Sequence, residues 1–297
     1  MSAYPFNWSR LQSAEDMDVG RHFEYDQDAL EMFKRWLPVL QNGEQILEVG
    51  SGSGFFTGKL LQIYPLAEIT CLEPDPELRL SLTKKYPDVK VIDTPLEELS
   101  GLDSSFDLAV SHIVIHNLPD PVLAIRQMAR VVRQGGHVIC IEPVLGSRTI
   151  YPVEGVKDAA DTLWQYTVNL CMKRSELMDS PNRQNPYLSL YPEYFDEVGL
   201  TNIHSHGWCS VFTLSDARFD YNERKLWIKR RTELYRSQRE MVTQGLIESG
   251  MEKSKIEAAY KTLFEYFEVL GSASEEQLSH QHEQEIGSRT ITVGQKV

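Results

Sequence analysis

Short apolar runs alternate with helical patterns between residues 45 and 142. The runs are QILEV, EITCLE, VKVID, FDLAVS and HVICIE. They are apolar almost throughout rather than at every second residue, which is typical of strands that helices cover on both faces. Such repeated strand–helix units predict an α/β fold with a doubly wound, mostly parallel sheet.

The helix predicted before the last of these runs has clear boundaries. Asp120 can cap its amino end, with Pro121 at the first helical position, and Gly135-Gly136 follows it. Its apolar stripe consists of Ile125, Met128, Ala129 and Val132.

The flanking regions predict additions to this core. Residues 1–40 form an aromatic arm and a helix at 28–40, and the arm contains Tyr4, Phe6, Trp8, Phe23 and Tyr25. Beyond Pro143 we expect a helix within 155–180, a break at SPNRQNP, a short helix at 192–200 and a strand at 201–214.

Residues 217–285 are long, charged and helical in pattern. Ser254 can cap a helix that ends at Gly271, and RTITVGQKV then predicts a final strand. We therefore expect a core domain made of residues 41–216 and 286–297, with 217–285 inserted as a lid or a dimer interface. Leu226, Trp227, Leu234 and Met241 could serve either role, which leaves a homodimer open.

The segment Ile46-Leu47-Glu48-Val49-Gly50-Ser51-Gly52-Ser53-Gly54 is a buried strand that ends in GxGxG and leads into a helix. Glycines let the backbone turn tightly and approach a ligand closely. Acidic residues also lie at the ends of the predicted strands. Glu48 lies at the end of this strand, and Glu73 and Asp93 lie at the ends of the next two. These positions share the carboxyl edge of the sheet, where open α/β sheets bind ligands.

ILEVGSGSG resembles the first motif of class I, Rossmann-like S-adenosylmethionine-dependent methyltransferases of the small-molecule type, and the resemblance continues over residues 25–143. It implies a seven-stranded sheet with an antiparallel last strand, S-adenosyl-L-methionine as cofactor and S-adenosyl-L-homocysteine as product. The implied cofactor-binding residues are Glu48, Gly50, Ser51, Gly52, Gly54, Glu73, Pro74, Asp93, Thr94 and Ser111.

The resemblance also implies roles for the acidic residues. Glu48 would receive the cofactor's ammonium group, Glu73 its ribose hydroxyls and Asp93 its adenine amine. Structural alternatives stay open: Glu48 could cap the helix at Phe55, Glu73 could begin a turn, with Asp75 as its substitute on the ribose, and Asp93 could cap a short helix at LEEL.

Two histidines follow the fourth strand near the expected reaction centre. His112 and His116 could act as general bases if the acceptor is a hydroxyl or a protonated amine, and both could equally be packing residues. His204, His206 and Cys209 suggest a metal, but no fourth ligand follows at a recognisable spacing, so we predict none. Aromatic residues could line an apolar acceptor pocket: Tyr4, Trp8, Tyr25, Trp164, Tyr166 and Trp208.

Charge limits the partners. The 30 basic and 43 acidic residues give a net charge of −13, which argues against nucleic acid and anionic membranes as partners. A basic run is balanced by glutamates and predicts a solvated helix face, with an anionic acceptor as the alternative: Arg224, Lys225, Lys229, Arg230, Arg231, Arg236 and Arg239. Four scattered cysteines without a CxxC pair and the lack of a leader or long apolar run favour a cytoplasmic protein.

The predicted function is methyl transfer to a small-molecule acceptor by in-line displacement. A catalytically silent S-adenosylmethionine-binding protein is the first alternative. An NAD-dependent oxidoreductase is disfavoured because its GxGxxG fingerprint requires glycine at position 55, which is Phe55. An RNA methyltransferase is disfavoured by the charge and by the lack of an RNA-binding module.

Overall fold

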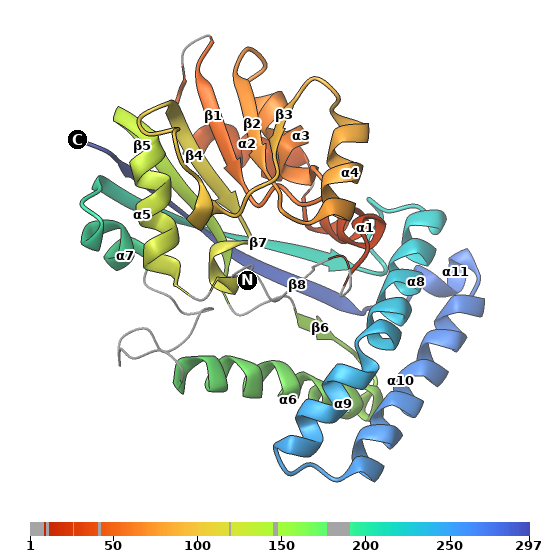
Figure 1. Cartoon of the computed structure of the whole chain (residues 1–297). Helices are drawn as coiled ribbons and strands as arrows, with labels where there is room; N and C mark the ends of the chain where they lie inside the picture. Colours follow the sequence, from red (N-terminus) through yellow and green to blue (C-terminus); the bar gives the residue numbers. More distant parts are fainter. Residues whose placement is uncertain are drawn as a thin grey trace.

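One mixed sheet organises the computed structural model, which describes residues 9, 12–25, 27–40, 43–118, 120–144, 148–176 and 191–297. The strand order is β3-β2-β1-β4-β5-β8-β6, with β7 also paired to β8 (Figure 1). The first five strands are parallel neighbours: β1 (Gln45–Val49), β2 (Glu68–Leu72), β3 (Lys90–Ile92), β4 (Phe106–His112) and β5 (Val132–Pro143).

The last strand, β8 (Gln284–Gln295), runs antiparallel to all three of its neighbours. β7 (Thr201–Thr213) pairs along its whole length on one edge. The other edge pairs with β5 through residues 289–295 and with the short β6 (Arg148–Ile150) through residues 284–286. β8 therefore extends the sheet beyond the parallel core.

Helices cover both faces of the parallel core, as the continuous apolar strands require. On one face, α2 (Gln27–Trp36) and α3 (Phe55–Ile63) pack on alternate residues of β1, β4, β5 and β8. On the other, α5 (Pro121–Val131) and α7 (Tyr191–Glu197) pack on the intervening residues. α4 (Pro76–Lys85) follows β2, and single turns of 3₁₀-helix lie at Leu96–Glu98 and Ile115–Asn117.

A second apolar core joins the remaining helices at the far end of β7 and β8 (Figure 1). They are α1 (Ala14–Glu24), α6 (Glu154–Glu176), α8 (Tyr221–Ser237), α9 (Arg239–Glu248), α10 (Lys253–Ser272) and α11 (Glu275–Leu278). α8 to α11 lie between β7 and β8 in the chain, and Phe23 and Phe212 link them to the sheet. We call α8 to α11 the helical block.

The α/β class and the mostly parallel sheet with an antiparallel last strand are confirmed. Asp120 caps α5 as predicted, by accepting from the Leu123 amide at 2.9 Å. Ser254 does not cap α10, because the helix begins at Lys253 and the cap position is Glu252, two residues before Ser254. Val132 belongs to β5 rather than to the helix before it. β6 was not predicted, since three residues carry too little pattern.

Some predicted features lie outside the described residues. They are Tyr4, Phe6 and Trp8 of the arm and the SPNRQNP segment. In the part of the chain that the structure describes, no helix combines the length and the apolar character needed to cross a bilayer.

The second core makes the helical block part of the cooperative fold. Leu263 on α10 is fully buried there, so Leu263→Ala should lower the free energy of unfolding by ~2–5 kcal/mol. Urea denaturation followed by circular dichroism measures this change. Val269→Ala on the same helix is the control, because Val269 is 66% exposed and should cost under ~0.5 kcal/mol. Equal losses would mean that α10 is not packed as described.

Candidate functional site

The turn after β1 crosses the carboxyl edge of the sheet where the strand order reverses, between β1 and β4. It is fastened to β2, because the amides of Gly50 and Ser51 donate to the Leu72 carbonyl at 2.9 and 3.1 Å. Gly52 has φ +57°, and no described atom lies within 4 Å of where its Cβ would stand. The turn thus presents bare backbone to open space.

Glu48 lies beneath this turn and is 1% exposed. Its Oε2 accepts from the Thr57 hydroxyl at 2.6 Å and from the Cys71 thiol at 3.5 Å. Burial raises the pKa of this carboxyl to about 7, although the hydroxyl and thiol partners favour the ionised form. Glu48 therefore contacts α3 only through the Thr57 side chain. The alternative that Glu48 caps this helix is wrong, because Gly54 stands at the cap position and no side chain caps α3.

Glu73 joins the end of β2 to the glycine turn. One oxygen accepts from the Gly52 amide at 2.7 Å and the other from the Asp75 amide at 2.9 Å. Burial raises the pKa of Glu73 to about 7 against the effect of these amides. Asp75 caps α4 by accepting from the Glu77 and Leu78 amides, so its carboxylate is engaged away from the turn. Pro74 links the two acidic residues.

Asp93 lies at the rim of the site and is 63% exposed. Arg79 donates to its Oδ1 at 2.6 Å and to the Glu73 carbonyl at 2.9 Å, which ties the ends of β2 and β3 together. The 3₁₀ turn at Leu96–Glu98 has Pro95 at its cap position, so the alternative that Asp93 caps it is wrong. Thr94 is partly buried beside it.

Glu142, at the end of β5, is fully buried and holds the loop that follows β4. It accepts the amides of Val114, Ile115 and His116 at 3.2, 3.0 and 3.4 Å, and Ser111 donates at 3.5 Å. The loop lies against the glycine turn, because a Cβ at Gly50 would stand 2.6 Å from Val114 Cγ2. The sequence predicted no role for Glu142, which is the last residue of the run HVICIE.

Both candidate bases are hydrogen-bonded. His116 Nδ1 lies 2.7 Å from Glu142 Oε2, the geometry of a histidine oriented by a carboxylate. His112 Nε2 is bonded to the Tyr25 hydroxyl, and its ring stacks on Phe56 at 4.6 Å. Burial, with Arg21 and Arg289 nearby, holds the pKa of His112 well below its usual value, so this ring is neutral.

The remaining residues that the sequence suggested for the site lie in different parts of the structure. Tyr25 and Trp208 lie together near His112, with ring centroids 4.6 Å apart, whereas Tyr166 packs beside Gly245 in the helical core. The prediction of a solvated basic face is wrong for three residues, because Arg224 and Arg231 are buried and the Arg230 side chain is only 10% exposed. Trp227 is also fully buried within the chain, which excludes it from a dimer interface.

No cluster suited to a metal occurs among the described residues. His206 stacks on Trp36 with centroids 4.8 Å apart, and His204 packs edge-on against His206. Cys209 is exposed further along β7.

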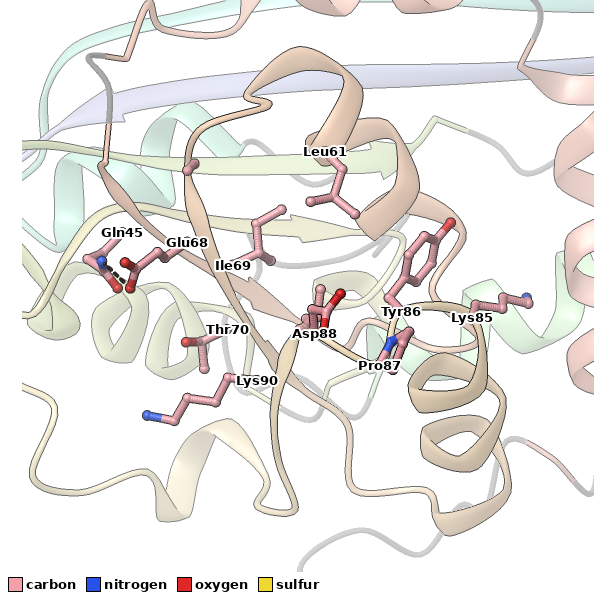
Figure 2. A pocket seen from close by; sticks show the side chains of 12 residues that line it. Gln45, Leu61, Glu68, Ile69, Thr70, Lys85, Tyr86, Pro87, Asp88 and Lys90 are labelled. Carbon is pink, nitrogen blue, oxygen red and sulfur yellow. Dashed lines mark hydrogen bonds between the residues drawn. The ribbon is translucent and has the colours of Figure 1, made fainter.

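A pocket of ~560 Å³ lies elsewhere, between α3, β2 and the segment leading into β3 (Figure 2). Gln45, Glu68 and Lys90, at the amino ends of the first three strands, form part of its lining. Because it extends to the edge opposite the glycine turn, it is not the candidate site.

Comparisons with known proteins agree with this geometry. Residues 47–140 match the family model described as a methyltransferase domain. An uncharacterised methyltransferase of Schizosaccharomyces pombe is 32% identical over 129 residues, which cover 40% of this chain and 46% of that protein. A demethylmenaquinone methyltransferase of Bacillus velezensis is 26% identical over 131 residues, covering 41% and 54%. The chain thus spans about half the length of these curated relatives.

The fold is also similar to that of solved structures. Phosphoethanolamine N-methyltransferase 2 of Haemonchus contortus, in complex with S-adenosyl-L-methionine, aligns with a TM-score of 0.53 and 12% identity. The alignment covers 99% of this chain and 60% of that one. At this identity the likeness concerns the fold.

The raised pKa of Glu48 predicts a pH-dependent stability. A carboxyl whose folded pKa of about 7 exceeds 4.5 stabilises the fold below pH 4.5 and loses that contribution as pH rises through 7. Relative to the wild type, Glu48→Gln should therefore gain up to about 3 kcal/mol between pH 4.5 and pH 7.5. Urea titrations of both proteins across this range measure the difference. A difference independent of pH would show that Glu48 stays ionised.

Proposed function

We propose that this chain, which carries a domain of the class I, Rossmann-like S-adenosylmethionine-dependent methyltransferase family, transfers a methyl group from S-adenosyl-L-methionine to a small-molecule acceptor. S-adenosyl-L-homocysteine is the second product. The observation that carries the proposal is the bare turn at Gly52, which lies at the strand-order reversal between two buried carboxylates.

The residues present fit this cofactor. The space facing Gly52 admits a ligand against the backbone, and the buried carboxylates of Glu48 and Glu73 suit a cation and a diol respectively. In the proposed arrangement Glu48 receives the ammonium group, Glu73 the ribose hydroxyls and Asp93 the adenine amine. Ser111, at the end of β4, lies against the cofactor in the same arrangement. A positive charge beside Glu48 would favour its ionised form.

When bound, the cofactor would supply an electrophilic methyl group on a sulfonium: the acceptor's lone pair would attack the methyl carbon in line with the carbon–sulfur bond, which would break to release S-adenosyl-L-homocysteine. The chain's task is to align the two reactants. Glu142 fixes the loop after β4 against the glycine turn and orients His116. For an acceptor that must lose a proton, His116 is the proposed base, because its ring is held by the Glu142 carboxylate.

The alternatives predict different ligands. Phe55, the first residue of α3, stands where the dinucleotide fingerprint has its third glycine, which disfavours NAD. A silent cofactor-binding protein would bind S-adenosyl-L-homocysteine without turning over any acceptor. The net charge of −13 disfavours nucleic acid as the acceptor.

The cellular location and the oligomeric state are also part of the proposal. Buried thiols at Cys71 and Cys140 accord with a cytoplasmic setting, because they act as small apolar groups there. A homodimer could still use Leu226 and Met241, which are 37% and 38% exposed.

The first test is calorimetric titration with S-adenosyl-L-homocysteine and, separately, with NAD. The wild type should bind S-adenosyl-L-homocysteine at micromolar concentration, and Gly52→Ala should lose more than about tenfold in affinity because its Cβ enters the ligand space. Gly101→Ala is the control, since Gly101 also has a positive φ, +72°, and an open Cβ position but lies on the loop before β4. Binding of NAD alone would overturn the proposal.

The acidic residues should contribute unequally. Glu73→Gln should weaken S-adenosyl-L-homocysteine binding by ~1.5–3 kcal/mol, because a buried carboxylate accepting from hydroxyls is lost. Asp93→Asn should reduce the binding free energy by less, since the Asp93 side chain is exposed and already forms an ion pair with Arg79. The same titration ranks the two variants, and a larger loss at Asp93 would contradict the assigned roles.

A further inference from the structure

A buried group of arginines lies between α1, α8 and β8. Arg289 is 3% exposed, Arg230 and Arg231 have side chains 10% exposed, and Arg21 is 25% exposed at the solvent edge. We call these four residues the arginine cluster. Few proteins bury several guanidinium groups together, because each loses its hydration.

Only two buried carboxylates pair with the cluster in the described structure. Glu24 Oε2 accepts from Arg21 and Arg289, at 2.7 Å from each. Glu285 lies 3.4 Å from both Arg230 and Arg231. Four cations therefore share two anions.

Other acidic groups nearby are engaged elsewhere. Glu283 accepts from the Tyr266 hydroxyl, and burial raises the pKa of its carboxyl, which favours its neutral form. Asp216 pairs with Arg218. The surplus of positive charge in the arginine cluster is thus not offset by these residues.

Hydrogen-bonding capacity is also left over. Nε of Arg230, Arg231 and Arg289 is buried, and within the described residues it has no hydrogen-bond partner. A buried donor without a partner costs free energy, so each such group needs an explanation. Planar guanidinium forks match the oxygens of carboxylates and phosphates.

The arginine cluster borders the candidate site. Arg289 pairs with Pro143 in the register of β8 and β5, one residue beyond Glu142. It lies on the same face of β8 as Ile291 and Val293, because alternate residues share a face. Tyr25 then connects the two regions: it follows Glu24 in the chain, and its hydroxyl is bonded to His112 at the end of β4.

We propose that the arginine cluster binds an anionic group of the methyl acceptor, so that the substrate is a small molecule bearing a carboxylate or a phosphate. The inference rests on the proposed function. The anion approaches from Arg21, the most exposed member, and makes the hydrogen bonds that the guanidinium groups lack. Glu24 competes with it for the same arginines.

The probes are sodium phosphate and sodium succinate, titrated into the full chain saturated with S-adenosyl-L-homocysteine, with sodium chloride at matched ionic strength as reference. Thermal unfolding reports binding, because a ligand that binds the native state raises Tm. At least one of the two anions should raise the wild-type Tm beyond the chloride reference. A larger shift with phosphate would identify the acceptor's anionic group as a phosphate, and a larger shift with succinate would identify it as a carboxylate.

Two variants test the arginine cluster itself, one that removes a positive charge and one that removes a negative charge. Arg230→Gln should weaken anion binding at least threefold, and Glu24→Gln should strengthen it at least threefold by removing the competing carboxylate. Arg236→Gln should leave it unchanged, because Arg236 is 60% exposed on the same helix. Two variants of opposite expected effect keep the test decisive if one of them folds poorly.

No anion-specific shift in the wild type, or equal shifts in all variants, would overturn the proposal and leave the arginine cluster a purely structural network. The proposed function is measured separately, by S-adenosyl-L-homocysteine binding without added anion. Cofactor binding with no anion response would overturn only the acceptor class. An anion response in a protein that binds no S-adenosyl-L-homocysteine would overturn the proposed function, and with it the assignment of the anion to a methyl acceptor.

Discussion

The geometry of the candidate site depends on one buried carboxylate, that of Glu142. It lies where β5 ends and accepts three consecutive backbone amides of the loop after β4. Those amides would otherwise be buried near the sheet edge without partners, a cost that grows with each group. Because Val114 of this loop packs on Gly50, the position of the glycine turn follows from the same interaction.

Much of the parallel core could be predicted from the sequence. Its strands are continuous apolar runs, and Asp120-Pro121 marks a helix start by local chemistry alone. The acidic residues at the strand ends could be located because parallel strands bring their carboxyl ends to one edge. The hydrogen bonds of these acidic residues could not be predicted, since the contact of Glu73 with the Gly52 amide depends on how the turns after β1 and β2 lie against each other.

The helical block was predicted less well, for a physical reason. A helix rich in arginine and glutamate has the pattern of a solvated surface, and only its neighbours decide which charges are covered. The side chains of Arg230 and Arg231 are only 10% exposed, because β8 presents Glu285 to them and α1 packs over the same side. Glu285 and Arg289 in turn look like ordinary residues of an alternating strand until the partner helix is known. Contacts between distant segments carry this information, and periodicity does not.

The pairing of β7 with β8 has a consequence for the chain's architecture. Thr213 and Gln284 are register partners, so the two ends of the 70 residues between them lie side by side. A tight β-hairpin turn could join these strands directly without disturbing the sheet. Closing so short a connection costs little chain entropy. The α/β core and the helical block are therefore separable in topology. Residues 214–283, which carry Arg230 and Arg231, could be replaced as one segment with the glycine turn left unchanged.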